Sequence, residues 1–495
     1  MKTEVEEETL QGSSSVNAVF SNVFWKFAER ILAQGLSFVI SLVLARILLP
    51  DDYGAVAIVL VFIAFADVFV VSGFSASLIQ KKDADETDFS TIFYCGLAVS
   101  IVLYLMVFSA SEAIANFFNM PILSSVLKVF ALRIPLSSFN SVQHAYVSRH
   151  MMFKKFFFST LFGTIFSGAA GIIFAVKGFG VWALVIQYLT NSCVDSIVLA
   201  FTIYWHPKLL FSWKAAKSLM SYGWKILASS FLGVFFYQLR NILIGKFYTS
   251  SELAYYNKGH QFPSLVANNI STSIMSVLFP LLSNKSDDIA TVKTMLRRSV
   301  QVSSYAMYPL LFGMATIAEP MVLVLLTEKW LPAVPFVQIL CVSSAIELID
   351  SISVQGLNAI GESGAVLKLE LIKKPVYFML LVLGLKKGVL AVALSLLINS
   401  VYIGIVHAGA LKLYVGYRFR ELAKDLLPAS ALSLISCGIC WFAKLLPIPR
   451  VFALFVQILA AMTIYILLSK ILRVESYKYL LDFAVSRTRK GELHR

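Results

Sequence analysis

Charged side chains occur inside long apolar stretches of this chain, where a membrane protein usually carries none. A charge at the centre of a membrane span costs about 2.5–3.5 kcal/mol unless it faces water or a partner. A helical bundle that keeps such charges is therefore expected to move a polar or charged molecule. The residues that we single out are the cations Lys26, Arg30, Arg133, Arg240 and Lys258 and the carboxylates Glu29, Asp67, Glu347 and Asp350.

The first group lies on one helix face. Lys26, Glu29 and Arg30 have i, i+3, i+4 spacing, so their side chains are neighbours on a helix. One interpretation is a salt-bridged helix end whose long side chains reach the membrane surface. The other is a cationic lining at the mouth of a cavity, where Arg30 binds a phosphate with its planar guanidinium.

The remaining cations lie deeper in their spans. Arg133 is followed closely by Pro135, Arg240 lies far from either end of its apolar stretch, and Lys258 precedes Pro263, which can kink a helix. We predict that these cations, with Lys26 and Arg30, bind an anionic substrate.

The embedded carboxylates are the acidic partners of these cations or carriers of a coupling proton or sodium ion. Glu347 and Asp350 are three residues apart and share a helix face, and Asp67 lies inside an early span. Asp195 equally suits a buried structural carboxylate.

The elements that must position these residues are membrane-spanning helices. The 495-residue chain is 58% hydrophobic with a mean hydropathy of +0.78, whereas soluble domains are about 45–50% apolar. Because lipid offers the backbone no hydrogen bonds, we predict an all-α integral membrane protein. We place fourteen spans, at residues 19–49, 53–79, 89–110, 122–147, 156–176, 180–204, 226–245, 253–282, 300–326, 334–360, 365–385, 389–411, 422–446 and 451–472.

The distribution of basic residues predicts the orientation. The side that holds both termini carries 28 of the 42 Lys and Arg residues, including Lys368, Lys373 and Lys374, and the other side carries 8. Cytoplasmic loops are rich in Lys and Arg, so both termini are expected in the cytoplasm. The net charge of +14 is therefore a mark of topology, and we expect no nucleic-acid partner.

The chain also repeats itself. Trp25-Lys26 and Trp224-Lys225 each begin an apolar span, and residues 45–56 align loosely with residues 245–257. Parallel repeats of this kind place a substrate site near the middle of the membrane. The predicted parts are a polar cytoplasmic tail (1–16), an N-lobe of six spans (17–205), a basic linker (206–225), a C-lobe of six spans (226–412), two further spans (413–472) and a basic cytoplasmic tail (473–495).

Ordinary catalysis and cofactors are not expected. The sequence has no phosphate-binding Gly loop, no metal motif and no Ser/His/Asp set in a supporting context. The five Cys residues lie in apolar stretches, where they are typical of small buried side chains, and the six His residues are scattered without ligand spacing. The acidic first residues lack the basic start of a signal peptide, so the first span is expected to stay in the mature protein.

Three segments resemble a known family. ARILLPDDYGAVAI (45–58), ILIGKFYTSSELAYYNKGHQFP (242–263) and SIMSVLFPLLSNKSDD (273–288) are similar to the polysaccharide transporter family of the multidrug/oligosaccharidyl-lipid/polysaccharide (MOP) exporter superfamily. The likeness is greatest to Wzx-type flippases of the colanic-acid and teichuronic-acid kind. It covers nearly the whole chain.

The resemblance implies a two-lobed helical bundle of the MOP type that flips an undecaprenyl-diphosphate-linked oligosaccharide by alternating access. In related lipid flippases, charges on the first helix line a cationic cavity, and Lys26, Glu29 and Arg30 match them by position. Relatives often carry an Asp just before the ILIG run, where this chain has Arg240. The role of that acid therefore cannot be transferred to this chain.

Three functions are weighed. A flippase in the bacterial inner membrane would have a lipid-linked oligosaccharide, membrane lipids, a coupling Na⁺ or H⁺, and a polymerase and glycosyltransferases as partners. A drug/cation antiporter of the same superfamily would have a site dominated by acids, whereas this chain embeds both signs of charge. A membrane polymerase or ligase would need a large outer loop, and the loops predicted on that side are short.

Overall fold

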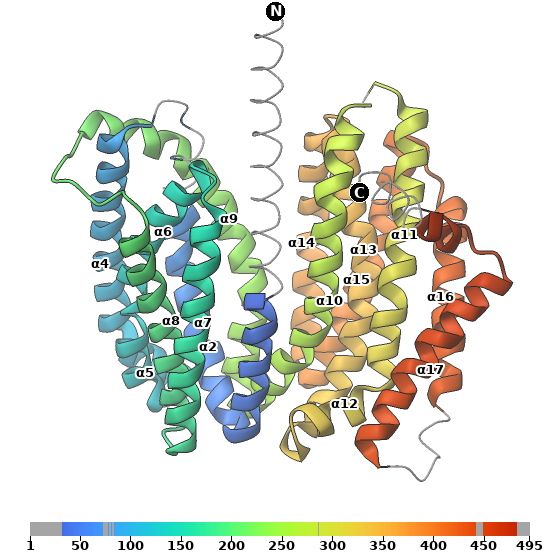
Figure 1. Ribbon diagram of the computed structural model, residues 1–495, viewed down its shortest axis with the longest axis horizontal. Helices are drawn as coiled ribbons and strands as arrows, with labels where there is room; N and C mark the ends of the chain where they lie inside the picture. Colours follow the sequence, from blue (N-terminus) through green and yellow to red (C-terminus); the bar gives the residue numbers. More distant parts are fainter. Residues whose placement is uncertain are drawn as a thin grey trace, which may run out of the picture. The chain divides into compact units, whose positions relative to one another are not determined.

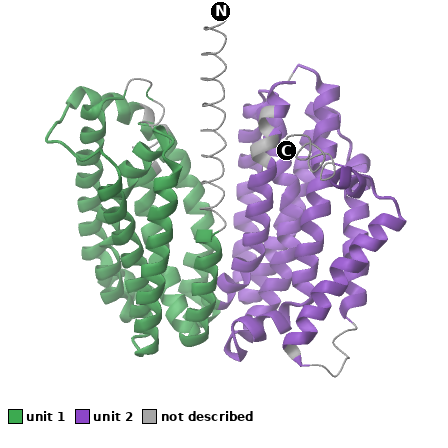
Figure 2. Ribbon diagram, in the orientation of Figure 1, with its two compact units in different colours: residues 1–254 green, residues 255–495 purple. Residues whose placement is uncertain are grey.

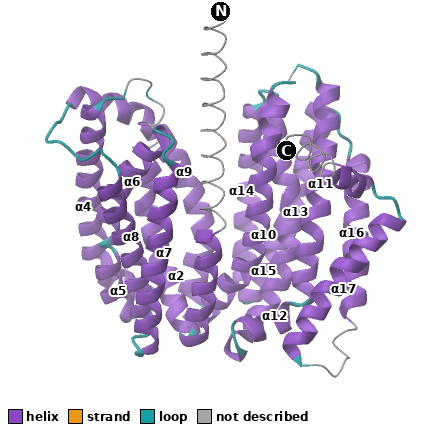
Figure 3. Ribbon diagram, in the orientation of Figure 1, coloured by secondary structure: helices purple, strands orange, loops and turns teal. Residues whose placement is uncertain are grey.

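The computed structural model describes residues 32–72, 78, 81, 84–285, 287–441 and 449–482. Within these ranges every regular element is a helix (Figure 3). The chain divides into two compact units, Met1–Ala254 and Tyr255–Arg495 (Figure 2). The seventh predicted span, 226–245, belongs to the first of these units and not to the second.

Unit 1 is a bundle whose helices pack pairwise along the chain. α7 lies along α8, α6 packs on α4 and α8, and α2 packs on α8 and α9. Its core includes Phe89, Ile92, Val142 and Trp205, which are buried together. Its elements (Figure 1) are a first helix at Leu32–Ile47, α2 (Pro50–Asp67), the π turn η1 (Val68–Ser72), α4 (Glu86–Phe117), α5 (Ile122–Phe130), α6 (Arg133–Arg149), α7 (Phe153–Val176), α8 (Val181–Thr202) and α9 (Trp213–Phe247).

Unit 2 is a second bundle, built around α13. This helix packs on α11 and α15, α14 packs on α15, and α16 packs on α11 and α17. Its elements are α10 (Ser250–Ser283), which begins at the end of unit 1, α11 (Ile289–Thr316), α12 (Ala318–Leu325), η2 (Glu328–Ala333), α13 (Val334–Ala359), α14 (Ser363–Leu385), α15 (Val389–Val415), α16 (Phe419–Trp441), α17 (Arg450–Ile471) and a short helix at 475–482.

Ten of the described helices are long and apolar enough to cross a membrane, and the pair α11 and α12, bent by 74°, would make eleven. Helices occupy the described parts of all fourteen predicted spans. Among them, α14 is less apolar than a simple span because it carries Lys368, Glu370, Lys373 and Lys374. This helix therefore holds embedded charge.

Local sequence explains where several helices begin and end. Pro50 stands at the first position of α2, where its missing N–H costs no helical hydrogen bond. Asp85 caps α4: its carboxylate accepts from the Asp88 N–H at 2.8 Å, and the Asp88 carboxylate accepts from the Asp85 N–H at 3.1 Å. α15 ends at Gly416, whose φ of +69° suits glycine.

The fourth predicted span is interrupted in its middle. α5 ends at Phe130 and α6 begins at Arg133. Pro135 has no N–H to donate to the carbonyl of Ala131, and the Ile134 N–H donates to that carbonyl at 2.9 Å instead. The break places Arg133 at the start of a helix inside the span.

The two segments that align as an internal repeat touch each other. The Ser250 hydroxyl donates to a carboxylate oxygen of Asp51, which joins the starts of α10 and α2. A Cβ at Gly54 would overlap the Ser250 carbonyl. Glycine at position 54 therefore lets the two helix starts approach closely.

Candidate functional site

The embedded charges that the structure describes contact partners within their own unit. Lys26, Glu29 and Arg30 lie outside the described residues, and their predicted roles remain predictions. The other six predicted site residues are the Arg133–Asp67 pair and Arg240 in unit 1, and Lys258, Glu347 and Asp350 in unit 2.

Arg133 forms an ion pair with Asp67. The Arg133 Nη1 lies 3.4 Å from the Asp67 Oδ2, and each side chain is 26% exposed. Both residues stand at irregular points, since Arg133 opens α6 after the break and Asp67 ends α2 before the π turn η1. A guanidinium that is partly exposed and held at one long contact can exchange its carboxylate for a phosphate.

Arg240 lies on α9 and is half-buried. Its guanidinium carbon is 4.9 Å from the centre of the Tyr237 ring, and the Asn241 amide donates to the Gln238 side chain at 2.8 Å on the same helix. This arrangement of a cation, an aromatic ring and two amides offers groups that bind phosphate and sugar hydroxyls.

Lys258 is 6% exposed inside unit 2. Its ammonium donates to the Gln261 side chain at 3.0 Å and lies 5.8 Å from the ring of Trp330, which is fully buried. Neighbouring Gly259 packs directly on Phe336. Lys258 therefore lies in a closely packed part of the unit, away from solvent.

Asp350 belongs to a cluster of ionisable groups from three helices. Its Oδ1 lies 2.9 Å from the Lys373 ammonium and 2.7 Å from the His407 Nε2. Lys373 also pairs with Glu370 at 2.5 Å and lies 3.2 Å from the His407 Nε2. We call these four residues, Asp350, Glu370, Lys373 and His407, the α13–α15 cluster.

Burial makes the α13–α15 cluster energetically demanding. Lys373 and His407 are 5% and 0% exposed, so they depend on each other and on the two carboxylates for hydrogen-bond partners. Nε2 of His407 cannot donate to Asp350 and accept from Lys373 at the same time when the ring is neutral. Moving one proton within the cluster must therefore rearrange its hydrogen bonds.

Glu347 lies one turn before Asp350 on α13, in a hydroxyl-rich setting. Its Oε1 accepts from Ser400 at 3.1 Å and from Ser343 at 3.3 Å, and these two hydroxyls are 2.7 Å apart. α13 thus presents two carboxylates to α15 with different partners, one bonded to neutral hydroxyls and the other to cations.

Sequence reasoning missed Lys373 and His407. The sequence analysis counts Lys373 among the basic residues on the side of the termini and His407 among the scattered histidines, whereas the structure buries both beside Asp350. A signal was present, because Glu370, Lys373 and Lys374 have i, i+3, i+4 spacing within the span predicted at 365–385. Only packing of α14 on α15 reveals His407 as the partner.

Asp195 is a structural carboxylate in unit 1. Its Oδ2 lies 2.9 Å from the His144 Nε2, and the Ser159 hydroxyl donates to its Oδ1. These contacts join α6, α7 and α8. Among the described residues, no group of three or more His, Cys, Asp and Glu side chains has the geometry of a metal site.

The chain matches the profile of a family described as polysaccharide biosynthesis protein over residues 43–335. It is 27% identical to the succinoglycan biosynthesis transport protein ExoT of Rhizobium meliloti, over 71% of this chain and 72% of that protein. It is 26% identical to the lipopolysaccharide biosynthesis protein WzxC of Escherichia coli, over 65% and 66%. For the teichuronic acid biosynthesis protein TuaB of Bacillus subtilis the identity is 25%, over 56% and 58%.

The fold is similar to that of solved transporters. The lipid II flippase MurJ in its inward closed conformation superposes with a TM-score of 0.75 at 17% identity, covering 93% of this chain and all of that one. An inward-facing multidrug resistance transporter of the MATE family superposes with a TM-score of 0.61 at 15% identity, covering 81% and 99%. At these identities the likeness establishes a shared all-helical membrane fold of the MOP type.

Proposed function

Since this chain belongs to the polysaccharide biosynthesis protein family, we propose that it is a flippase that carries a polyprenyl-diphosphate-linked oligosaccharide across a membrane by alternating access. The family match over residues 43–335 carries the proposal. The chain is a multi-pass membrane protein, with ten described helices suited to span a bilayer. We place it in the bacterial inner membrane with both termini in the cytoplasm, and the substrate's lipid would be of the undecaprenyl type.

The proposed substrate contacts are the embedded cations. A diphosphate carries negative charge that a membrane interior cannot solvate, so Lys or Arg must replace water around it. We assign this role to Arg30, Arg240 and Lys26, with Arg133 able to turn from Asp67 to the substrate. Lys258 would join them only after leaving Gln261.

The proposed coupling ion is a proton. The α13–α15 cluster already holds the Lys373 ammonium between Asp350 and Glu370, where a sodium ion would otherwise find carboxylate oxygens. His407 supplies an imidazole whose Nε2 lies 2.7 Å from Asp350 and can carry a proton. A proton bound or released here would change the hydrogen bonds between α13 and α15.

Coupling is tested in vesicles by imposing either a pH gradient or a sodium gradient. The proposal requires that the pH gradient alone accelerates translocation, and that His407→Gln abolishes this acceleration while leaving passive translocation measurable. Acceleration by sodium at constant pH would assign the coupling to another ion.

The flippase proposal itself is tested by reconstitution. Purified protein in vesicles is given a fluorescent polyprenyl-diphosphate oligosaccharide, and its appearance in the opposite leaflet is measured. Arg30→Ala and Arg240→Ala should each lower the rate by about tenfold, the effect of one lost charge-assisted hydrogen bond. Lys412→Ala, at the exposed end of α15, is the matched control. Wild-type rates in both Arg variants would remove these residues from the binding role.

Two alternatives are weaker. A drug/cation antiporter would share the fold, but a fold does not identify a substrate. Transport of an organic cation by the same vesicles, with no oligosaccharide translocation, would favour this alternative. A membrane polymerase or ligase is opposed by the relatives, among which is a transport protein. Partnership with a polymerase and glycosyltransferases is part of the proposal.

A further inference from the structure

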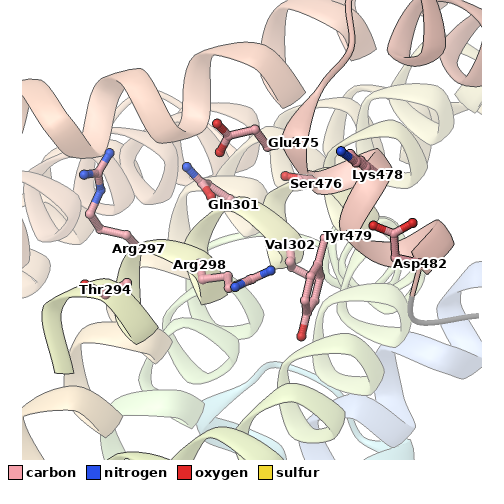
Figure 4. A pocket seen from close by; sticks show the side chains of 10 residues that line it. All are labelled: Thr294, Arg297, Arg298, Gln301, Val302, Glu475, Ser476, Lys478, Tyr479 and Asp482. Atoms are coloured by element: carbon pink, nitrogen blue, oxygen red, sulfur yellow. The ribbon is translucent and has the colours of Figure 1, made fainter. Parts of the chain in front are cut away.

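A pocket of about 570 Å³ lies between α11 and the short helix at 475–482 in unit 2 (Figure 4). Thr294, Arg298 and Gln301 line one wall from a single face of α11. The facing helix presents its polar side to them. A pocket with such a lining suits a polar or charged ligand.

The lining carries both signs of charge. Arg298 and Lys478 supply cations, and Glu475 and Asp482 supply carboxylates. Among the described residues, none of these four forms an ion pair. The guanidinium carbon of Arg298 lies 3.8 Å from the centre of the Tyr479 ring. This stacking holds the guanidinium in place and leaves its N–H groups able to donate hydrogen bonds.

The back of the pocket is fixed and electrically balanced. Arg297 donates through Nε and Nη2 to the two oxygens of Asp425, at 2.8 and 2.9 Å. Gln301 and Tyr417 donate to the same carboxylate at 2.8 and 2.7 Å. Asp425 is therefore fully engaged, and the charges left to bind a ligand are those of Arg298, Lys478, Glu475 and Asp482.

A second space, of about 490 Å³, adjoins the first and shares Arg297, Gln301, Glu475 and Ser476 with it. Its far wall is apolar, with Leu432 and Ile435 of α16 and Leu472 after α17. Ile435 and Leu472 are exposed at the surface of helices that are apolar enough to span a membrane. The two spaces together have a charged end and an apolar end that opens toward lipid.

We propose that this pair of pockets binds an aminophospholipid, with the headgroup between α11 and residues 475–482 and the start of an acyl chain along α16. The phosphodiester accepts hydrogen bonds from Arg298 and Lys478. The primary ammonium, which carries three N–H donors, donates to one of the two carboxylates, Glu475 or Asp482, which stand two helical turns apart. This site is distinct from the proposed substrate contacts and does not depend on the flippase proposal.

The balance of charges selects the headgroup. An anionic headgroup such as a glycerol phosphodiester would meet two carboxylates without an ammonium to neutralise them. A choline headgroup carries a positive charge but no N–H to donate to those carboxylates. Ethanolamine satisfies both halves of the lining.

Native mass spectrometry of the full-length protein in detergent tests the proposal. Phosphatidylethanolamine, phosphatidylcholine and phosphatidylglycerol with identical acyl chains are added in turn, and the bound fraction is measured. Wild-type protein should prefer phosphatidylethanolamine by about tenfold, the worth of one charge-assisted hydrogen bond. Arg298→Gln should weaken all three lipids. Glu475→Gln combined with Asp482→Asn should remove the preference and improve phosphatidylglycerol.

Lys470→Gln, near the pocket but outside its lining, is the control and should bind as wild type. Equal binding of the three lipids by wild-type protein, or a preference that survives the double substitution, would overturn the proposal. Soluble phosphoethanolamine distinguishes the lipid from its headgroup. If phosphoethanolamine binds as tightly as the lipid, the second, apolar space contributes nothing to affinity and the lipid assignment fails.

Discussion

At the scale of single residues, the structure separates embedded charges that are held from those that can exchange partners. Lys373 lies among Asp350, Glu370 and His407 within 3.2 Å of each. Arg133 has one contact with Asp67, at 3.4 Å, and both side chains remain partly exposed. The first arrangement suits a fixed or proton-exchanging centre and the second suits transient binding of an anion.

Removing the Lys373 ammonium should destabilise unit 2 strongly. In Lys373→Met, Asp350 and Glu370 lose their shared cation, and breaking a buried pair in this way costs about 3–5 kcal/mol. We expect a clear drop in the unfolding temperature of the purified protein in detergent. Lys374→Met is the control, since the Lys374 side chain is 39% exposed and its ammonium lies 3.3 Å from Glu370, a pair worth about 0–1 kcal/mol. Equal effects of both substitutions would refute the distinction.

The Arg133–Asp67 pair should matter for transport more than for stability. Arg133→Gln removes a cation that can reach the substrate, so we expect translocation to fall by about tenfold. Lys128→Gln is the control, because Lys128 pairs with the exposed Glu112 at 3.4 Å. A translocation rate unchanged in Arg133→Gln, measured in vesicles at equal protein density, would restrict Arg133 to a structural role.

At the scale of elements, part of the embedded charge lies where helices are irregular. α5 and α6 are separated just before Arg133, and α2 passes into a π turn just after Asp67. α11 and α12 meet at 74°. α14, which holds Lys373, carries four charged residues and is less apolar than a simple span. Charge and backbone irregularity coincide because both need polar partners that lipid does not supply.

The contact between the starts of α2 and α10 should be sensitive to one methyl group. In Gly54→Ala the new Cβ would overlap the Ser250 carbonyl, and overpacking of this kind costs about 1–3 kcal/mol. We expect a lower unfolding temperature and slower translocation. In Gly409→Ala, inside α15, the Cβ has open space around it, so stability should be unchanged or slightly raised. A wild-type unfolding temperature in Gly54→Ala would show that the starts of α2 and α10 can move apart without loss of stability.

At the scale of the whole molecule, the family and the all-α membrane fold inferred from the sequence are confirmed by the family match and by the fold likeness to MurJ. The number of fourteen spans remains a prediction. Among the described helices, ten or eleven are long and apolar enough to cross a membrane. The orientation also remains a prediction, since it rests on the distribution of Lys and Arg alone.

Cysteine labelling in cells tests the orientation. In a variant whose five native Cys residues are replaced, Lys177→Cys lies between α7 and α8 and Asn284→Cys lies after α10. A membrane-impermeant maleimide should label position 177 in intact cells and position 284 only after lysis. Labelling with the opposite preference would invert the predicted topology.

The sequence by itself determined the class of the protein and its family. Long apolar runs predict helices, because a backbone in lipid must form its hydrogen bonds internally. The segments at 45–58 and 242–263 carry the family resemblance. It also marked Asp67, Arg133 and Asp350 as unusual, because a charge within an apolar run can be read without knowing what surrounds it.

Only the tertiary structure decided which charges are partners. His407 lies 57 positions after Asp350 and touches it because α13 and α15 pack together. Lys373 counts in the sequence as a basic residue of the cytoplasmic side and is buried in the fold. Lys258 is predicted from the sequence as a substrate contact and is enclosed beside Trp330. Pairing depends on distances between side chains on different helices, and a linear pattern of residue types holds no information about those distances until the helices pack.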